Sequence, residues 1–190
     1  MNPLIVLAII ALVTLGGGLL PTVVKPVAKK NPERVLLFGD SFAQGLMGPM
    51  EQAARQAGSE FRARGEKSTR IDSWSKSEGL RKLLTDFQPT LVFISLGTND
   101  EQMGPGVVER QRQALEELLT LVTSAPGFRE LVWIGPPELN RPSNGVIPML
   151  QERLAQYFYS EKLDIPRAAD GLHPTSAGYK LWADAVWAGQ

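Results

Sequence analysis

Four residues of this sequence have side chains that together could carry out acyl transfer: Ser41, Asn99, Asp170 and His173. A serine hydroxyl is a weak nucleophile unless a base lies beside it, and His173 is the one histidine in the chain. Asp170 comes three residues before His173, so its carboxylate can hold one imidazole nitrogen and fix the tautomer. The side-chain amide of Asn99 is a donor suited to a developing oxyanion. The residue types therefore indicate a serine hydrolase.

Each of these candidates follows a short apolar segment of the kind that forms a buried strand. The carboxyl ends of parallel strands meet at one edge of a sheet, where ligands bind in such folds, so the candidates are expected to converge there. The segments are residues 35–38 before Ser41, residues 91–95 before Asn99, and residues 163–167 before Asp170 and His173.

The rest of the chain alternates between strand and helix patterns, which is typical of a parallel sheet with helices on both faces. We therefore predict an α/β fold with three layers, an α/β/α sandwich. Helices are expected at residues 43–57, 80–87, 107–125, 147–159 and 176–187, and further strands at 61–64 and 131–134.

Composition excludes several other classes of protein. The chain has 190 residues, and that length favours one domain. It contains no cysteine, so disulfides, thiolate metal sites and a cysteine nucleophile are excluded. Twenty basic and 20 acidic residues give a net charge of zero, which lacks the basic footprint of a nucleic-acid-binding protein. No partner of that kind is expected.

Three sequence blocks resemble, in order and spacing, those of the SGNH (GDSL-like) hydrolases: residues 38–42, 96–100 and 170–174. The resemblance spans residues 34–187 and implies a flavodoxin-like parallel sheet and an esterase that needs no metal or cofactor. It also implies that Ser41 is the nucleophile and that Asp170 and His173 complete a catalytic triad. By the same resemblance, Asn99 and the backbone N–H of Ser41 form the oxyanion hole.

One block departs from the family pattern. Where the family often has a glycine whose N–H completes the oxyanion hole, this chain has Ser68, within residues 65–69. Serine keeps the N–H, but glycine alone adopts unusual backbone angles at no cost. Some cell-envelope members of the family are similar here, including an Asp-x-Trp element like residues 72–74.

The N-terminal part is expected to lie outside the hydrolase domain of residues 33–190. Residues 4–20 carry no charge, so residues 1–20 are interpreted as a membrane anchor, or alternatively a cleaved signal, and residues 21–32 as a tether rich in proline and lysine. Resemblance to envelope members places the domain in the bacterial periplasm, at the inner membrane. The basic residues after the apolar run, by the positive-inside rule, favour the cytoplasm instead.

The expected reaction is removal of a short acyl group, such as acetyl, from a polar envelope carbohydrate, because the loop at residues 136–148 is polar. A lysophospholipase or thioesterase is the alternative within the same chemistry. From other classes, Asp40, Asp100 and Asp170 could hold Mg²⁺ in a phosphatase, or the fold could be an inactive binding scaffold. The sequence assigns neither substrate-binding residues nor an oligomeric state.

Overall fold

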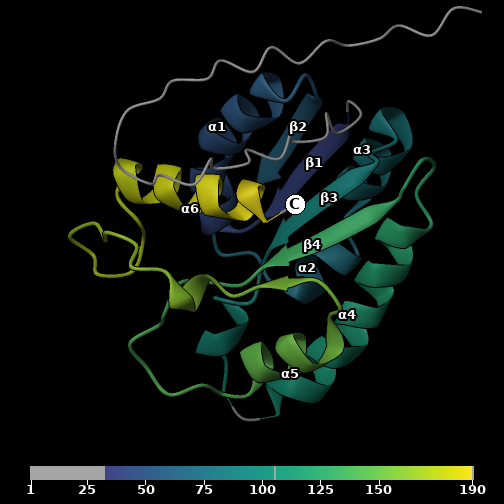
Figure 1. Ribbon diagram of the computed structural model, residues 1–190. Coiled ribbons are helices and arrows are strands. Elements are labelled where there is room, and N and C mark those ends of the chain that lie inside the picture. The colour runs from purple at the N-terminus through teal and green to yellow at the C-terminus, as the bar shows by residue number, and fades with distance from the viewer. Residues whose placement is uncertain (1–32, 105, 190) are drawn as a thin grey trace, which may run out of the picture.

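The computed structural model describes residues 33–104 and 106–189. In this part of the chain, five parallel strands form one sheet in the order β2-β1-β3-β4-β5, with helices on both faces (Figure 1). The predicted three-layer α/β/α sandwich is confirmed. Its strands are β1 (Arg34–Gly39), β2 (Glu60–Gly65), β3 (Leu91–Ser95), β4 (Glu130–Ile134) and β5 (Tyr157–Phe158). Its α-helices are α1 (Ser41–Gln56), α2 (Ile71–Ser75), α3 (Glu78–Phe87), α4 (Val107–Thr123), α5 (Val146–Arg153) and α6 (Ser176–Ala188), and short 3-10 helices span Asp100–Gln102 and Ser160–Lys162.

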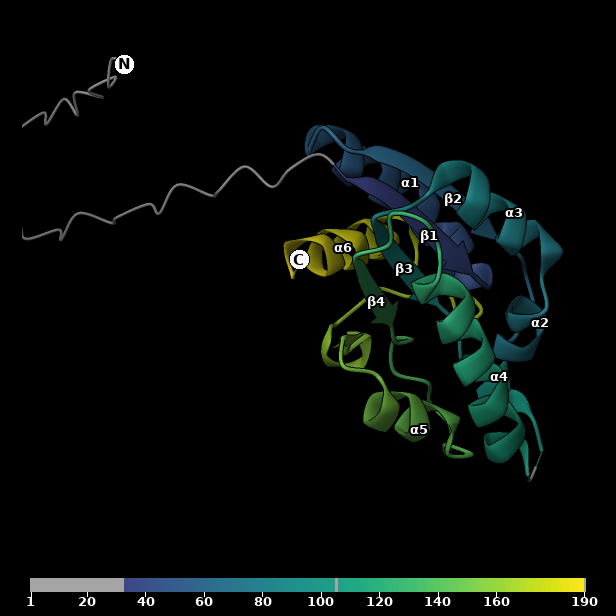
Figure 2. The same cartoon turned by 90° about the vertical axis from the view of Figure 1, so that its right-hand side faces the viewer.

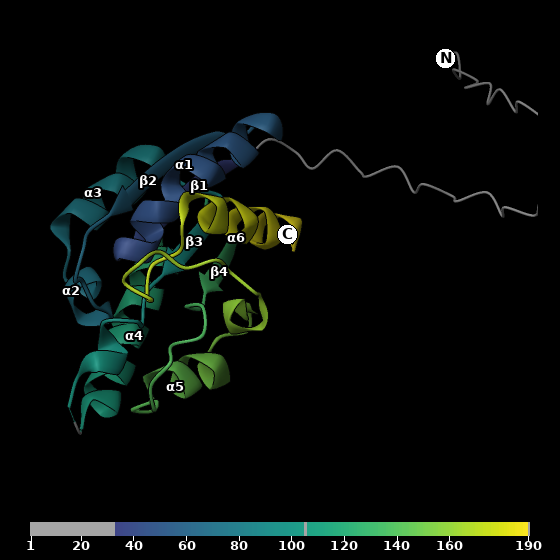
Figure 3. The ribbon, with the colours of Figure 1, turned by 90° about the vertical axis from the view of Figure 1, so that its left-hand side faces the viewer.

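The side chains of β1 alternate between two hydrophobic cores, one on each face of the sheet. Val35 and Leu37 pack with residues of α1 and α6, on the side that Figure 3 shows. Leu36 and Phe38 pack with residues of α2, α3, α4 and α5, on the side that Figure 2 shows. Because both faces of this strand are covered, its sequence is an unbroken apolar run rather than an alternating one.

The helix predicted over residues 147–159 is wrong in its second half. Helix α5 ends at Arg153, and Tyr157–Phe158 forms the edge strand β5 instead. The backbone N–H groups of Trp133 and Gly135 donate to the carbonyls of Gln156 and Phe158, so this stretch extends the sheet. Aromatic residues favour strands, and a short apolar run does not distinguish the two structures by periodicity.

The strand expected at residues 163–167 also needs correction. Arg167 forms only an isolated antiparallel bridge with Pro174, and the segment does not join the sheet. Asp170 and His173 therefore lie in a loop that leads into α6, not at the end of a strand. This loop nevertheless reaches the edge of the sheet where β1 and β3 end, as the contacts of His173 show below.

No helix within residues 33–104 and 106–189 is long and apolar enough to cross a membrane. The predicted anchor at residues 1–20 and the tether at residues 21–32 lie outside the described residues.

Candidate active site

The turn from β1 into α1 fixes the position of Ser41. Gly39 has a φ of +152°, and a Cβ there would lie 1.9 Å from the carbonyl oxygen of Ser95, so only glycine fits. The next residue, Asp40, caps α1 by accepting a hydrogen bond of 2.9 Å from the N–H of Phe42. Ser41 is therefore the first residue of the helix, where backbone N–H groups have no partner within the helix.

Ser41, His173 and Asp170 form a continuous hydrogen-bonded chain. The Oγ of Ser41 lies 2.9 Å from Nε2 of His173, and Nδ1 of His173 lies 2.7 Å from Oδ2 of Asp170. The other carboxylate oxygen of Asp170 accepts from the N–H groups of Leu172 and His173, each at 2.9 Å. The bond to the His173 ring and these two N–H groups lower the pKa of Asp170 to about 2. The carboxylate is thus ionised at neutral pH and can hold an Nδ1–H, leaving Nε2 free to accept a proton.

The ring of Phe42 packs against the imidazole of His173. The rings of Phe42 and His173 have centroids 5.3 Å apart, and Phe42 in turn meets Trp182 of α6 edge-on at 5.6 Å. Phe42 and Trp182 are both buried. Phe42 of α1 thus contacts both His173 and helix α6, and this packing helps to hold the loop of His173 against Ser41.

Asn99 follows β3 and lies beside the N-terminus of α1, as predicted. Its amide nitrogen donates to the carbonyl oxygen of Thr69 at 2.9 Å and to Oδ2 of Asp40 at 3.3 Å. Asp40, the residue before Ser41, thus contacts the amide that was expected to bind an oxyanion. The contact with Asp40 is the longer and weaker of the two, and it is the one that an oxyanion could replace at lower cost.

Ser68 has a φ of +60°, in the left-handed region that favours glycine, the residue that the family often has at this place. The segment that carries it is tied to the β1–α1 turn, because the N–H of Glu66 donates to the carbonyl of Gly39 at 2.9 Å. Among the described residues, no acceptor pairs with the backbone N–H of Ser68 or of Ser41. The backbone N–H groups of Ser41 and Ser68 are therefore both free to bind an acceptor.

Two fully buried carboxyl groups, Asp40 and Asp100, lie behind the site. Burial is the main cause that raises the pKa of Asp40 to about 7; the charge of Asp100 adds to it, and the N–H of Phe42 opposes it. Burial likewise raises the pKa of Asp100 to about 7, against the N–H of Ile71. These groups cap helices and orient the backbone. Within the described part of the chain, no group of three or more His, Cys, Asp or Glu side chains could hold a metal ion.

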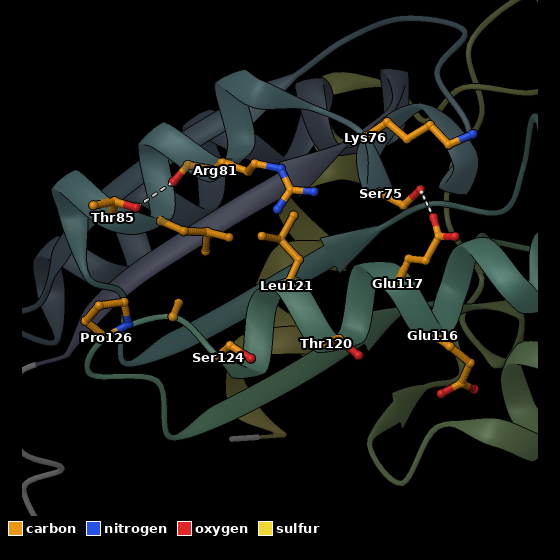
Figure 4. A pocket seen from close by; sticks show the side chains of 12 residues that line it. Ser75, Lys76, Arg81, Thr85, Glu116, Glu117, Thr120, Leu121, Ser124 and Pro126 are labelled. Carbon is orange, nitrogen blue, oxygen red and sulfur yellow. Dashed lines mark hydrogen bonds between the residues drawn. The ribbon is translucent and has the colours of Figure 1, made fainter.

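Ser41 and His173 line a cavity of about 390 Å³ together with Gln44, Gly45, Lys67 and Tyr179. Sequence reasoning missed the last four because they belong to no motif; only their nearness to Ser41 and Ser68 along the chain could have suggested Gln44 and Lys67. A larger cavity, of about 840 Å³, lies between α3 and α4 (Figure 4). None of the predicted site residues lines it.

A serine hydroxyl bonded to an imidazole that a carboxylate holds, on an α/β/α sandwich, is the arrangement of serine hydrolases. The particular family follows from the sequence. The model of the GDSL-like Lipase/Acylhydrolase family matches residues 37–181, and the chain belongs to this family. It is therefore an enzyme of the GDSL esterase and acylhydrolase type. No curated protein matches the chain.

Solved structures of similar fold include several esterases. The psychrotrophic esterase EstA from Pseudoalteromonas sp. is 20% identical, with a TM-score of 0.61 over 82% of this chain and 94% of that one. A carbohydrate acetylesterase family member from Sinorhizobium meliloti is 16% identical, with a TM-score of 0.59 over 82% and 96%. A carbohydrate esterase family 3 protein from Talaromyces cellulolyticus is 18% identical, with a TM-score of 0.54 over 82% and 95%. At these identities the likeness establishes the fold.

Proposed function

We propose that this protein is a serine esterase that hydrolyses carboxylic esters by acyl transfer. Ser41 is the nucleophile, His173 the general base and then the general acid, and Asp170 the residue that orients the imidazole. The observation that carries the proposal is the unbroken hydrogen-bonded chain from Oγ of Ser41 through both nitrogens of His173 to Asp170. This geometry satisfies the distance requirement for a nucleophile, its base and the group that orients the base.

In the first half-reaction, Oγ of Ser41 attacks the ester carbonyl carbon while its proton passes to Nε2 of His173. The tetrahedral intermediate then collapses, the ester bond breaks, and His173 returns the proton to the leaving alcohol. In the second half-reaction, water attacks the acyl-serine with the same assistance, which releases the carboxylic acid and restores Ser41. No oxidant or cofactor is required.

The oxyanion of each intermediate is held by the N–H groups of Ser41 and Ser68 and by the amide of Asn99. The two N–H groups have no acceptor among the described residues, so they are free for this purpose. The Asn99 amide gives up its 3.3 Å contact with Asp40 to reach the oxyanion. Donors already in place stabilise charge in the transition state without reorganisation, which is why such groups have large effects on rate.

The proposed substrate is a short acyl ester, such as an acetyl ester, on a polar carbohydrate. Two of the structural neighbours are named as carbohydrate esterases, which favours this class over others of the family. The cavity beside Ser41 also favours it, because apart from Gly45 each of its lining residues carries a polar group: Ser41, Gln44, Lys67, His173 and Tyr179.

A series of p-nitrophenyl esters tests both points with the full-length protein. We expect hydrolysis of the acetyl ester well above that of Ser41→Ala, and a decline in kcat/KM as the acyl chain lengthens. Equal rates for the protein and Ser41→Ala would contradict the proposed mechanism. A maximum at eight carbons or more would keep the mechanism but replace the carbohydrate ester by a lysophospholipid or an acyl thioester.

A further inference from the structure

Three polar side chains in the cavity beside Ser41 have no hydrogen-bonding partner among the described residues. They are the ammonium group of Lys67, the amide of Gln44 and the phenol of Tyr179. Burial raises the pKa of Tyr179 to about 12, so its phenol keeps its proton and can donate. Three unused donors thus surround the proposed nucleophile, and one of them carries a full positive charge.

The charge of Lys67 is not neutralised by the acidic side chains around it. Glu66, its neighbour in sequence, is paired with Arg64 at 2.6 Å. Asp170 is hydrogen-bonded to the ring of His173 and to two backbone N–H groups, not to Lys67. No carboxylate within residues 33–104 and 106–189 forms an ion pair with Lys67. Lys67 therefore brings an ammonium group without an ion-pair partner to this cavity, and an anionic ligand group can pair with it.

The backbone that carries Lys67 is fixed relative to Ser41. The N–H of Glu66 donates to the carbonyl of Gly39, two residues before Ser41, at 2.9 Å. Gly65 is packed so closely on α1 that a Cβ there would lie 2.7 Å from the backbone nitrogen of Gln44. The side chain itself is exposed and can adjust. A fixed backbone and an ammonium group that can change position suit a residue that contacts a substrate.

We propose that Lys67, assisted by Gln44 and Tyr179, binds an anionic group of the ester substrate, close to the acyl group that Ser41 removes. The inference rests on the proposed esterase function and adds a substrate class to it: esters whose alcohol part carries a carboxylate or a phosphate. An acylated uronic acid supplies the first group, and an acylated glycerol phosphate supplies the second. Both offer the ammonium group a compact anion and offer the amide and phenol an acceptor oxygen.

Matched pairs of small acetyl esters test this substrate class. One pair is O-acetylated methyl glucoside and the corresponding methyl glucuronoside; the other is acetylglycerol and acetylglycerol phosphate. At low salt we expect the anionic member of at least one pair to be hydrolysed with a kcat/KM about two- to fivefold higher, as one exposed charge pair provides. Preference within the first pair identifies a sugar acid, and preference within the second identifies a phosphate. Equal kcat/KM values within both pairs would overturn the inference.

Substitutions at Lys67 connect the preference to this side chain. Lys67→Gln should bring the ratio of kcat/KM for the anionic and the neutral ester close to one, Lys67→Glu should invert it, and Lys67→Arg should retain it. Raising the salt from about 0.02 M to about 0.5 M should weaken the preference of the unaltered protein. A ratio that stays high in Lys67→Gln would show that another group binds the anion and would overturn the assignment.

Lys76→Gln is the matched control, because it removes the same charge from an exposed lysine that lines the separate cavity between α3 and α4 (Figure 4). It should leave the ratio as in the unaltered protein; an equal fall there would indicate a general effect of net charge and count against Lys67. The Ser41→Ala variant separates the failure of the anion site from the failure of the esterase function. If the unaltered protein hydrolyses no ester faster than Ser41→Ala does, the esterase function itself fails. If both members of each pair are hydrolysed equally well, only the anion site fails.

Discussion

The guanidinium group of Arg167 donates hydrogen bonds to the carbonyl oxygens of Leu172 and Glu138. Leu172 directly precedes His173, and Glu138 lies in the loop after β4, so one side chain links the loop of the proposed base to the body of the sandwich. The N–H of Ala168 closes the same loop by donating to the carbonyl of His173 at 2.7 Å. The imidazole is therefore positioned both by the hydrogen bonds that hold its backbone and by its contact with the ring of Phe42.

Arg167→Met should lower kcat about 10- to 100-fold, because a small displacement of the base from the nucleophile has an effect of that size. KM should change much less, since Arg167 does not line the cavity beside Ser41. Arg167→Lys, which can reach one carbonyl but not both, should recover part of the loss. Steady-state kinetics measure the split, and thermal unfolding shows whether the fold is retained. Arg153→Met, which breaks an exposed ion pair with Glu116, is the control; an equal loss of kcat there would argue against a positioning role.

Asn99→Ala should lower kcat about 100- to 1000-fold, the effect seen when one oxyanion donor is removed. The change also leaves the carbonyl of Thr69 without its donor, so urea denaturation should accompany the kinetics. A loss of kcat below about fivefold in a folded variant would mean that the N–H groups of Ser41 and Ser68 hold the oxyanion without help from the side chain.

Ser68→Gly should raise the free energy of unfolding by about 0.5 to 1 kcal/mol, since glycine adopts a positive φ without the steric cost that serine bears. Ser68→Val should lower it by about 1 kcal/mol or more, because a β-branched side chain fits this region poorly. Urea denaturation measures both changes. The same sign for both substitutions would show that backbone conformation does not govern stability at this position.

Much of this structure could be predicted because it depends on local pattern. Buried strands such as β1 and β3 are unbroken apolar runs, and the motifs at their ends carry Ser41 and Asn99. Strand β5 could not be predicted in the same way, since its two residues become a strand only by pairing with β4. The short helix α2 was missed for a similar reason: its first N–H bonds to Asp100, which is distant in sequence.

In the site, too, some residues could be predicted from local pattern and others depend on contacts between distant parts of the chain. Ser41, Asp170 and His173 were predicted from residue types and spacing, and the structure brings them together. The contact between the rings of Phe42 and His173 could not be predicted in this way, because it joins residues that are far apart in the sequence. The cavity residues Lys67 and Tyr179 have no motif to mark them, because their role depends on which surfaces meet in the folded chain.

The buried carboxyl groups lead to a last prediction, on stability and pH. Because the folded state raises the pKa of Asp40 and Asp100 to about 7, it keeps their protons in a range where the unfolded chain, with ordinary carboxyl pKa values near 4, has lost them. The free energy of unfolding should therefore fall as the pH rises from about 4 to about 7, by up to roughly 4 kcal/mol for each of the two groups, and level off above. Asp170 acts in the opposite direction and only in acid, since its lowered pKa of about 2 makes the folded state less stable as the pH falls from about 4 to about 2.

Urea denaturation at about pH 4.5 and about pH 7.5 measures this difference. Asp100→Asn removes one of the two titrating groups, so the difference between the two pH values should shrink, whatever the substitution does to stability as a whole. Asp86→Asn, at an exposed carboxyl paired with Lys82, should leave the difference as it is. If the unaltered protein is as stable at the higher pH as at the lower, or more so, then Asp40 and Asp100 are ionised in the folded state already near pH 4.5. Their burial would in that case be offset by the N–H groups of Phe42 and Ile71 that they accept from.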